Sequence, residues 1–422
     1  MRRFYSCAIC CAAPFAFAVV LWRGLRDRSY WQGLAERFGW GRRMSAPTVW
    51  LHAVSLGEMS AAAPLVHAIR ARHPQTLLLL TTATPAGRAR AQALFGSSVD
   101  VRFLPYDTPG SVRRFLARIQ PRLAIIMETE LWPNLFGECE RRGVPVFLAN
   151  ARLSARSVFR YRRLGTLFSG LFTANVQVAA QTALDAERFQ SLGAPQARIH
   201  VAGNVKFDLQ LDAGIADQGR RLRTAIGGAR SVWIAGSTHA GEEEQVLEAH
   251  ALLLAERPDV LLLLVPRHKD RFAAVAELLA RRGVRFARRS SGIAADAGSE
   301  VLLVDTVGEL VPLYASADVA FVGGSLVAIG GHNLLEPAAL GLPVLTGPYN
   351  FNSPEIARLL LQRGAALQVA DARGLAAALH RLLDDPAARQ RIGAAGKQIV
   401  AANRGSVARL CALMEPWLAA YR

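Results

Sequence analysis

Residues 321–337 read FVGGSLVAIGGHNLLEP, the pattern of a strand followed by a glycine-rich loop and the start of a helix. A short apolar run, Val319–Val322, leads through two glycine pairs into a helix that begins near Asn333. Glycines let the backbone approach a ligand closely, and the N–H groups of a helix N-terminus bind phosphate. Glu336, one turn into the helix, could accept hydrogen bonds from a ribose diol. Two tight turns would use the glycines equally well, so the stretch alone leaves both interpretations open.

The same alternation of strand and helix extends outward from this stretch. Short apolar runs separated by amphipathic stretches, such as Ser60–Arg72 and Gly87–Leu94, indicate buried parallel strands. The runs form two series, which predict an α/β protein with two doubly wound, Rossmann-like domains. The predicted strands are Val49–His52, Thr76–Thr81, Val99–Leu104, Leu123–Met127, Val144–Ala149 and Val176–Ala180, then Val232–Ala235, Val260–Val265, Val284–Ala287, Val301–Val304, Val319–Val322 and Val344–Leu345.

The length of the chain agrees with two such domains. It has 422 residues, and domains average roughly 150 residues. The predicted organisation is a membrane anchor at 1–23, an N-terminal domain at 24–207, a polar linker at 208–230, a C-terminal domain at 231–405 and a closing helix at 406–422 with a short break at Pro416.

The segment Phe4–Trp22 contains no charged residue and is flanked by arginines. A helix of this length spans about 28 Å, close to the roughly 30 Å of bilayer hydrocarbon. A cleaved signal peptide is the alternative, but no small-residue cleavage site ends the run. Pro14 also allows a shallow or re-entrant helix. We expect an uncleaved anchor with the rest of the chain in the cytoplasm.

The composition is strongly basic. Lys plus Arg number 50 against 33 Asp plus Glu, a formal charge of +17, and only three of the 50 are lysines. Arginine binds phosphate through a planar fork, so the excess of arginine could serve to bind nucleic acid, an anionic membrane surface or a phosphorylated substrate. A genomic bias toward Ala and Arg would explain the excess equally well. The arginines are spread over predicted helices rather than clustered with aromatic residues, so we expect no nucleic acid. Five cysteines without disulfide or metal-ligand spacing indicate a reducing compartment.

Polar residues follow the predicted strands of the first series, where ligands of open α/β sheets bind. Ser55-Leu56-Gly57-Glu58 places a carboxylate at a helix N-terminus, where it could be a helix cap or a general base. Glu128 and Glu130 follow the next polar strand end, and if that strand continues through them both point to one face. Asn150–Ser154 follows a third strand.

The second series carries a guanidinium and two imidazoles at its strand ends. Val265-Pro266-Arg267-His268 ends one strand, and Ser237-Thr238-His239 ends another before Glu242–Glu244. The sequence contains no HxH, HExxH, DxD or GxSxG motif, so we expect neither a metal site nor a serine hydrolase. The chemistry that fits is transfer from a nucleotide-activated donor without a metal. The base would come from the first domain and the phosphate clamp from the second.

These motifs together resemble the Kdo (3-deoxy-D-manno-octulosonic acid) transferases of lipopolysaccharide biosynthesis, which have the GT-B fold. The resemblance is carried by Ser55–Glu58, Met127–Asn134, Asn150–Ser154, Lys206–Asp208, Val265–His268 and Gly331–Pro337. It implies CMP-Kdo as donor co-substrate, lipid IVA (the tetra-acyl lipid A precursor) as acceptor, no cofactor, and a place on the cytoplasmic side of the bacterial inner membrane, against its anionic lipids.

The resemblance also implies roles for individual residues. Glu58 would be the proton acceptor, and Glu128 and Lys206 would stabilise the transition state. CMP would contact Pro266, Arg267, Val307, Gly308, Glu309, Asn333, Leu334, Leu335 and Glu336. Val307 departs from the Thr or Met expected there, although backbone contacts would survive that change.

The chemistry of the residues agrees with an inverting displacement. An activated CMP-sugar has a good leaving group, so charge stabilisation by Arg267 matters more than an acid, whereas the acceptor hydroxyl needs a base. Three alternatives remain: a membrane-associated GT-B enzyme that uses a UDP-sugar, a basic membrane-tethered nucleic-acid-binding protein, and a catalytically silent lipid-binding scaffold.

Overall fold

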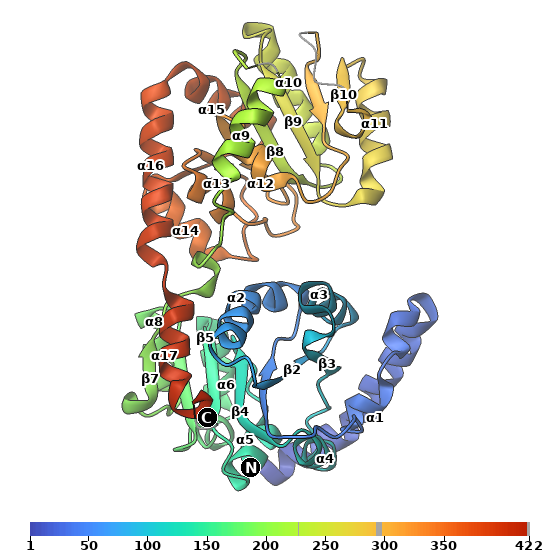
Figure 1. Ribbon diagram of the computed structural model, residues 1–422, viewed down its shortest axis with the longest axis vertical. Coiled ribbons are helices and arrows are strands. Elements are labelled where there is room, and N and C mark those ends of the chain that lie inside the picture. Colours follow the sequence, from blue (N-terminus) through green and yellow to red (C-terminus); the bar gives the residue numbers. More distant parts are fainter. Residues whose placement is uncertain (227, 293–297, 420–422) are drawn as a thin grey trace. The chain divides into compact units, whose positions relative to one another are not determined.

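The computed structural model describes residues 1–226, 228–292 and 298–419. The chain divides into two compact units, which Figure 1 labels by element. Unit 1 comprises Met1–Asp208 and the C-terminal residues from Asn403, and unit 2 comprises Leu209–Ala402. Each unit is built on one parallel sheet of seven strands, which confirms the predicted α/β class with two doubly wound units.

The sheet of unit 1 has the order β3-β2-β1-β4-β5-β6-β7. Its strands are β1 Thr48–His52, β2 Leu77–Thr82, β3 Asp100–Phe103, β4 Pro121–Met127, β5 Val146–Ala151, β6 Val176–Ala180 and β7 Ile199–Val201. Its helices are α1 Arg2–Arg26, α2 Leu56–Arg72, α3 Pro85–Phe95, α4 Pro109–Ile119, α5 Pro133–Arg141, α6 Ala155–Arg163, α7 Thr166–Ser169, α8 Ala183–Ser191 and α17 Ser406–Leu418.

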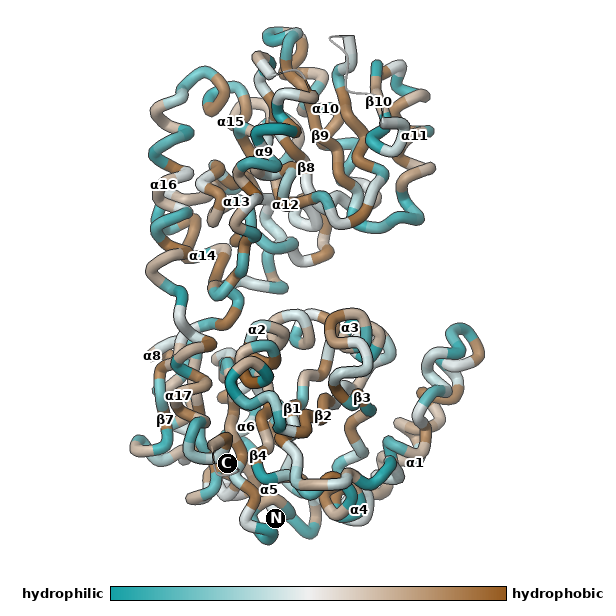
Figure 2. Tube along the Cα trace, in the orientation of Figure 1, coloured by the Kyte–Doolittle hydropathy of each residue, from teal (hydrophilic) through white to brown (hydrophobic). Residues whose placement is uncertain are grey.

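Helices cover both faces of this sheet because alternate strand residues point to opposite sides. Val49 and Leu51 of β1 pack with α2, α3 and α17, whereas Trp50 between them packs with α4, α5 and α8. Figure 2 shows central strands such as β2 and β9 in the brown of hydrophobic residues. Such burial on both faces is what continuous apolar strands indicate.

Five helices of unit 1 begin at a Ser or Thr whose hydroxyl accepts the N–H group three residues ahead. These caps are Ser55 for α2, Thr84 for α3, Thr108 for α4, Ser154 for α6 and Thr182 for α8. Each such cap stabilises a helix by about 1 kcal/mol. Because each cap follows a strand, the turns at the carboxyl edge of the sheet are fixed by local hydrogen bonds.

The sheet of unit 2 has the order β10-β11-β9-β8-β12-β13-β14. Its strands are β8 Val232–Thr238, β9 Leu261–Pro266, β10 Phe286–Arg288, β11 Val301–Leu303, β12 Val319–Val322, β13 Val344–Thr346 and β14 Ala366–Gln368. Its helices are α9 Ile215–Ala225, α10 Glu243–Glu256, α11 Phe272–Arg281, α12 Leu310–Tyr314, α13 Leu335–Leu340, α14 Pro354–Gln362, α15 Ala372–Asp384 and α16 Pro386–Asn403, which runs to the boundary with unit 1.

The structure differs from the expected linker and closing helix. Residues 208–230 contain α9, whose Arg223 bonds to Asp318 of unit 2 at 2.9 Å, so this segment is largely part of that unit. The closing helix α17 runs through Pro416 without the predicted break and packs on unit 1. Asp208 accepts the backbone N–H groups of Gly405 and Val407, both at 2.5 Å, and so holds the start of α17.

The predicted anchor segment is a single helix, α1, which continues through Pro14. Its start is held on unit 1, since Tyr5 donates to Asp107 at 3.0 Å and Ser6 donates to Asn134 at 2.7 Å. Further along, the ring of Phe17 meets that of Phe38 edge-on at 5.0 Å. Figure 1 shows α1 passing α4 at the side of the sheet where edge strand β3 lies.

Candidate active site

The order of strands in unit 1 reverses between β1 and β4, which are adjacent. Ligands of open α/β sheets bind beyond the carboxyl ends of the strands at such a switch point. Glu58 follows β1, and Glu128 and Glu130 follow β4. The structure therefore brings these three sequence-predicted carboxyl groups to the same end of the sheet, close enough to interact electrostatically.

Glu58 is held as a helix cap, and its carboxyl group also faces the other two. Its N–H bonds to Ser55 Oγ at 3.3 Å, while its Oε2 accepts the N–H of Val54 at 2.8 Å. Burial raises the pKa of Glu58, and the charge of Glu128 raises it further, against the lowering effect of the Val54 N–H. A raised pKa brings a carboxylate closer to the neutral range in which general bases work best.

Glu128 is held in a strained backbone conformation beside an arginine. Its φ is +56°, which is uncommon outside glycine, and Arg152 Nε donates to its Oε2 at 2.9 Å. Because β4 ends at Met127, the strand does not continue through Glu128 and Glu130, so the condition under which both would point to one face is not met.

The surroundings of Glu130 raise its pKa strongly. Burial, helped by the charges of Glu58 and Glu128, raises the pKa of Glu130 to about 7, although the Trp132 indole opposes the rise. At neutral pH this carboxyl group is therefore divided between its charged and neutral forms. Like charges that share a site push their pKa values apart in this way.

Asn150 connects the end of β5 to the segment that carries Lys206. Asn150 is fully buried with φ +55°, and its Oδ1 accepts the backbone N–H of Val205 at 3.1 Å. The neighbouring Asn204 accepts the N–H of Lys206 at 3.0 Å. The predicted catalytic residues Glu58, Glu128 and Lys206 thus all follow strands at the carboxyl edge of one sheet.

The glycine-rich loop of unit 2 is held by a buried acid, a role that the sequence did not reveal. Glu242 is fully buried and accepts the N–H groups of Gly324 at 2.7 Å and of Ser325 and Leu326 at 3.0 Å each. These amides are therefore not available to phosphate, contrary to the expectation for the first glycine pair. Gly324 has φ +69°, and a Cβ there would lie 2.9 Å from the His332 ring, which explains the glycine.

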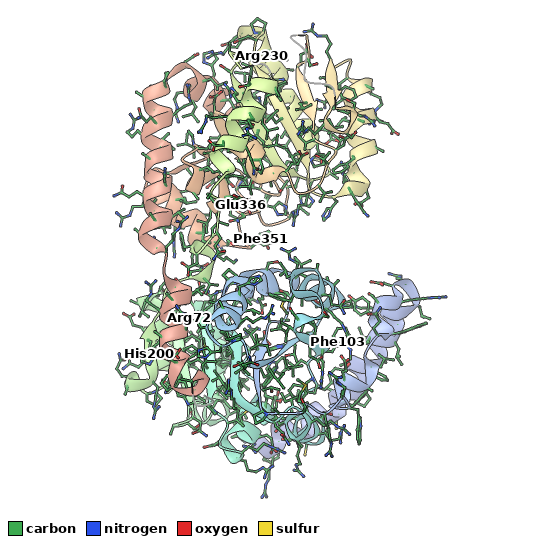
Figure 3. All side chains as sticks on the ribbon, in the orientation of Figure 1. Arg72, Phe103, His200, Arg230, Glu336 and Phe351 are labelled. Atoms are coloured by element: carbon green, nitrogen blue, oxygen red, sulfur yellow. The ribbon has the colours of Figure 1, made fainter. Side chains whose placement is uncertain are left out.

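The remaining predicted CMP contacts also follow strands of unit 2. Val307–Glu309 comes after β11, with Val307 80% exposed and Glu309 bonded to Arg289 at 2.9 Å. Asn333 donates to Glu336 at 3.0 Å and accepts the N–H of Leu335 at 3.1 Å. Figure 3 labels Glu336 and Phe351, which lie at the same end of unit 2.

Three histidines gather around Arg267 at this edge. His239 Nε2 and His332 Nε2 are 2.7 Å apart, with nearly parallel ring planes and ring centroids 5.0 Å apart, and His268 meets His239 edge-on at 5.4 Å. Burial lowers the pKa of His332 to about 4, with a smaller contribution from the positive charge of Arg267. The sequence placed His239 and His332 after separate strands, but their pairing depends on the tertiary fold.

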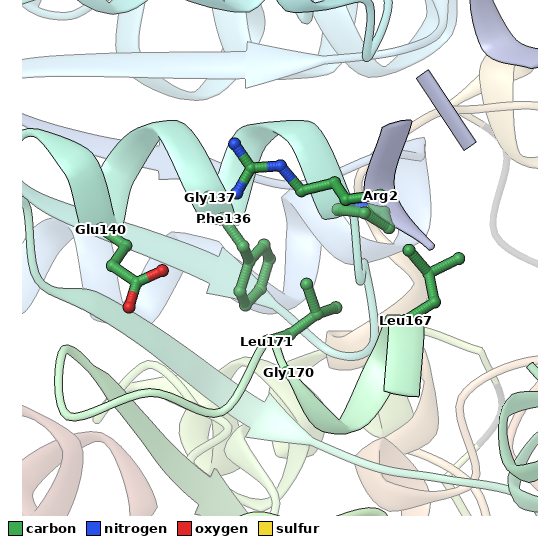
Figure 4. A pocket seen from close by; sticks show the side chains of 8 residues that line it. Arg2, Phe136, Gly137, Glu140, Leu167, Gly170 and Leu171 are labelled. Atoms are coloured by element: carbon green, nitrogen blue, oxygen red, sulfur yellow. The ribbon is translucent and has the colours of Figure 1, made fainter. Parts of the chain in front are cut away.

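Two further features lie outside these strand ends. Figure 4 shows a pocket on unit 1 in which Arg2 lies over Gly137, with Phe136, Leu167 and Leu171 beside them. Among the residues described, no group of three or more His, Cys, Asp or Glu side chains is arranged to hold a metal ion. In the same residues, α1 is the one helix long and apolar enough to cross a membrane.

Comparison with known proteins shows which families the two parts of the chain match. Residues 32–209 match the family described as 3-deoxy-D-manno-octulosonic-acid transferase, and residues 232–399 match glycosyl transferases group 1. A 3-deoxy-D-manno-octulosonic acid transferase of Haemophilus influenzae is 41% identical over 99% of both chains. One of Bordetella pertussis is 40% identical over 99% of both.

A solved structure shares the fold at low identity. UDP-GlcNAc 2-epimerase from Neisseria meningitidis bound to UDP-GlcNAc superposes with a TM-score of 0.54 and 16% identity, covering 84% of this chain and 98% of that one. At this identity the likeness concerns the fold alone, and with the two sheets it establishes the GT-B class.

Proposed function

The chain belongs to the 3-deoxy-D-manno-octulosonic acid transferase family, and on that premise we propose that it moves Kdo from CMP-Kdo to lipid IVA, with inversion and without a metal. The observation that carries the proposal is the carboxylate of Glu58, which accepts the Val54 N–H and whose pKa is raised by burial and by the charge of Glu128. Such a group suits the proton of an acceptor hydroxyl.

In this proposal the reaction is a single displacement. Glu58 takes the proton from a sugar hydroxyl of lipid IVA as that oxygen bonds to the anomeric carbon of Kdo. The bond from that carbon to the phosphate oxygen breaks at the same time, and CMP leaves. Glu128 and Lys206 stabilise the charge that develops on the way.

Unit 2 provides the donor site in this proposal. CMP contacts Pro266, Arg267, Val307–Glu309 and Asn333–Glu336, which follow β9, β11 and β12. A CMP-sugar carries one phosphate rather than a diphosphate, and a guanidinium such as that of Arg267 can bind its charge without a metal.

The protein would work at the cytoplasmic side of the inner membrane. On α1 the side chains of Phe4, Phe15 and Trp22 expose 81%, 76% and 55% of their surface, and arginines flank the apolar run. Exposed aromatic groups beside arginines are typical of the membrane interface, where arginines also meet anionic headgroups.

The test is a transfer assay with purified full-length protein, CMP-Kdo and lipid IVA, with products identified by mass spectrometry. We expect Kdo-modified lipid IVA in excess EDTA as well as in Mg²⁺, and none from UDP-sugars. Activity lost in EDTA and restored by Mg²⁺ would overturn the metal-independent part. A water-soluble acceptor analogue controls for the effect of Mg²⁺ on lipid packing.

A UDP-sugar donor is the second candidate because the chain shares its fold with UDP-binding proteins. Competition separates the two: CMP should inhibit transfer and UDP should not. Transfer from a UDP-sugar, inhibited by UDP alone, would replace the CMP-Kdo proposal.

A further inference from the structure

The His239–His332 pair has two states that differ by one proton. At 2.7 Å, one Nε2 must donate a hydrogen atom and the other must accept it. In the neutral pair, one ring therefore keeps a free Nδ1 lone pair and the other an Nδ1–H. One added proton gives the pair a positive charge and two outward Nδ1–H donors. A second would place hydrogen atoms on both facing nitrogens and break the contact.

The pair stands at the switch point of the unit 2 sheet. His239 follows β8 and His332 follows β12, and these adjacent strands lie where the strand order reverses. His239 and His332 are each half-buried, so part of each residue remains open to solvent. Anionic ligands of doubly wound sheets bind at this position.

The charged groups around the pair are mostly positive. From the end of β9 come Arg267 and His268, and from the start of α11 comes Arg271, which bonds to Glu243 at 3.1 Å. Burial lowers the pKa of His239, and the charges of His268, Arg267 and Arg271 lower it further. The empty site therefore keeps the pair neutral.

The nearby acids do not offset this positive charge. Glu242 is turned to the backbone N–H groups of the glycine-rich loop, and Glu336 accepts the amide of Asn333 at 3.0 Å. An anion that binds beside Arg267 would lower the positive potential and provide acceptors for the outward N–H groups. Both effects favour the protonated pair.

We propose that the His239–His332 pair takes up one proton from solvent when an anionic oxygen of the donor binds beside Arg267, and that the protonated pair then binds that oxygen. The proton is released again when the anion leaves. This inference rests on the proposed function, because it takes the strand ends of unit 2 as the donor site. The oxygen could belong to the phosphodiester or to the carboxylate of the sugar.

The test is isothermal titration calorimetry of the full-length protein in two buffers of different ionisation enthalpy, at about pH 6, where histidine titrates. The probe is cytidine 5′-methyl phosphate, a phosphodiester that does not itself titrate near this pH. We expect uptake of about one proton per site, with the affinity falling by up to roughly tenfold per pH unit as the pH rises. Free Kdo tests the carboxylate alone, and cytidine, which has no anion, should cause no uptake.

The variants His239→Gln and His332→Gln should bind the probe without taking up a proton. The matched control is His380→Gln on α15, whose imidazole is exposed and paired with Glu256 and Asp384, and it should behave as wild type. The inference would be overturned if the probe or Kdo binds to wild type with no proton uptake. It would also be overturned if proton uptake persists in both pair variants. Either result would leave the proposed function standing. If no cytidine phosphodiester binds at all, the CMP-Kdo proposal fails together with the inference. The wild-type titrations decide the question even if a variant does not fold.

Discussion

At the scale of single residues, Glu58 combines two roles that sequence analysis treats as alternatives. Its backbone and carboxylate close the first turn of α2 with Ser55 and Val54, as a helix-capping acid does. The same carboxylate lies within the field of Glu128 and Glu130. A cap that is also a base is rigidly placed, because its hydrogen bonds to the backbone fix its direction.

The first prediction is that Glu58→Gln keeps the fold and loses transfer. The amide oxygen of Gln can still accept the Val54 N–H, so thermal unfolding and CMP binding should stay near wild type. Without a base, initial rates should fall by about 10²–10⁴. The exposed Glu140→Gln on α5 is the control. A transfer rate close to wild type would mean that Glu58 only caps α2.

The second prediction concerns the charge of Glu130. An ionised Glu130 adds a negative charge beside Glu58 and Glu128, so Glu130→Gln should remove the inflection near pH 7 from the pH–rate profile. The pKa of Glu130 is raised on folding, from an ordinary value to about 7, so its ionisation costs stability as the pH rises through that range.

Denaturation at two pH values separates these effects. Glu130→Gln should unfold at higher denaturant concentration than wild type at about pH 8, where Glu130 is charged, and show no such gain at about pH 4, where it is neutral. An inflection near pH 7 that persists in Glu130→Gln, with the stability gain present, would show that Glu130 does not act on the base.

The site residues that a local sequence pattern indicates were predictable. Those whose position depends on contacts with distant segments of the chain were not. Glu58 and Arg267 stand directly after strands, so topology alone predicts their position. The bond from Asn150 to Val205 joins residues 55 apart in the chain, and no periodicity indicates it. The charge state of Glu130 likewise depends on burial and on two other carboxyl groups.

At the scale of elements, the glycine-rich loop of unit 2 depends on one acid at the start of α10. Both carboxylate oxygens of Glu242 accept backbone N–H groups, from Gly324 on one side and from Ser325 and Leu326 on the other. The loop then leads to His332 and Asn333, so this buried carboxylate positions the candidate donor site without touching the donor.

The third prediction is that Glu242→Gln loosens this loop. One oxygen would become an NH₂ group facing an N–H donor, which leaves a buried donor unsatisfied at a cost of about 1–3 kcal/mol. We expect a lower midpoint of urea unfolding and weaker CMP binding, both by calorimetry and by inhibition. Glu248→Gln, exposed on the same helix, is the control and should change neither. Unchanged CMP affinity would show that the loop does not support the donor site.

The core strands were predictable as elements, as were the edge strands β3 and β10, whereas β7 and β14 at the opposite edges were not. Each central strand is a run of apolar residues that matches its predicted position closely. β7 and β14 were missed because each has three residues and only one of them is fully buried. The expected linker contains α9 because its apolar side packs in unit 2, which a polar composition does not reveal.

At the scale of the whole molecule, the chain passes between its units twice, since it enters unit 2 after Asp208 and returns to unit 1 at Asn403. Unit 1 is therefore completed by the last helix of the chain as well as by the first. The sequence predicts both terminal helices, but not that Asp208 would bind the start of α17. That contact joins residues almost 200 apart in the chain.

The last prediction is that deleting residues 2–22 weakens membrane binding without abolishing it. The deletion removes Phe4, Phe15 and Trp22, which supply the exposed apolar surface of α1, but it leaves Arg23, Arg26 and Arg28. Each arginine near an anionic surface contributes about 1 kcal/mol, and salt screens this attraction. Flotation with anionic vesicles should show complete binding of wild type, and partial binding of the truncated protein that declines as salt is raised.

Two comparisons make this experiment decisive. Neutral phosphatidylcholine vesicles should retain wild type through α1 but not the truncated protein, because only the charge-dependent part of binding remains. The truncation also removes the bonds from Tyr5 to Asp107 and from Ser6 to Asn134, so its folding must be checked by thermal unfolding. Tyr5→Phe, which loses only the first bond, should stay on both kinds of vesicle. If the truncated protein folds but stays fully soluble with anionic vesicles in low salt, the basic surface takes no part in membrane binding. If both proteins bind neutral vesicles equally, α1 is not the anchor.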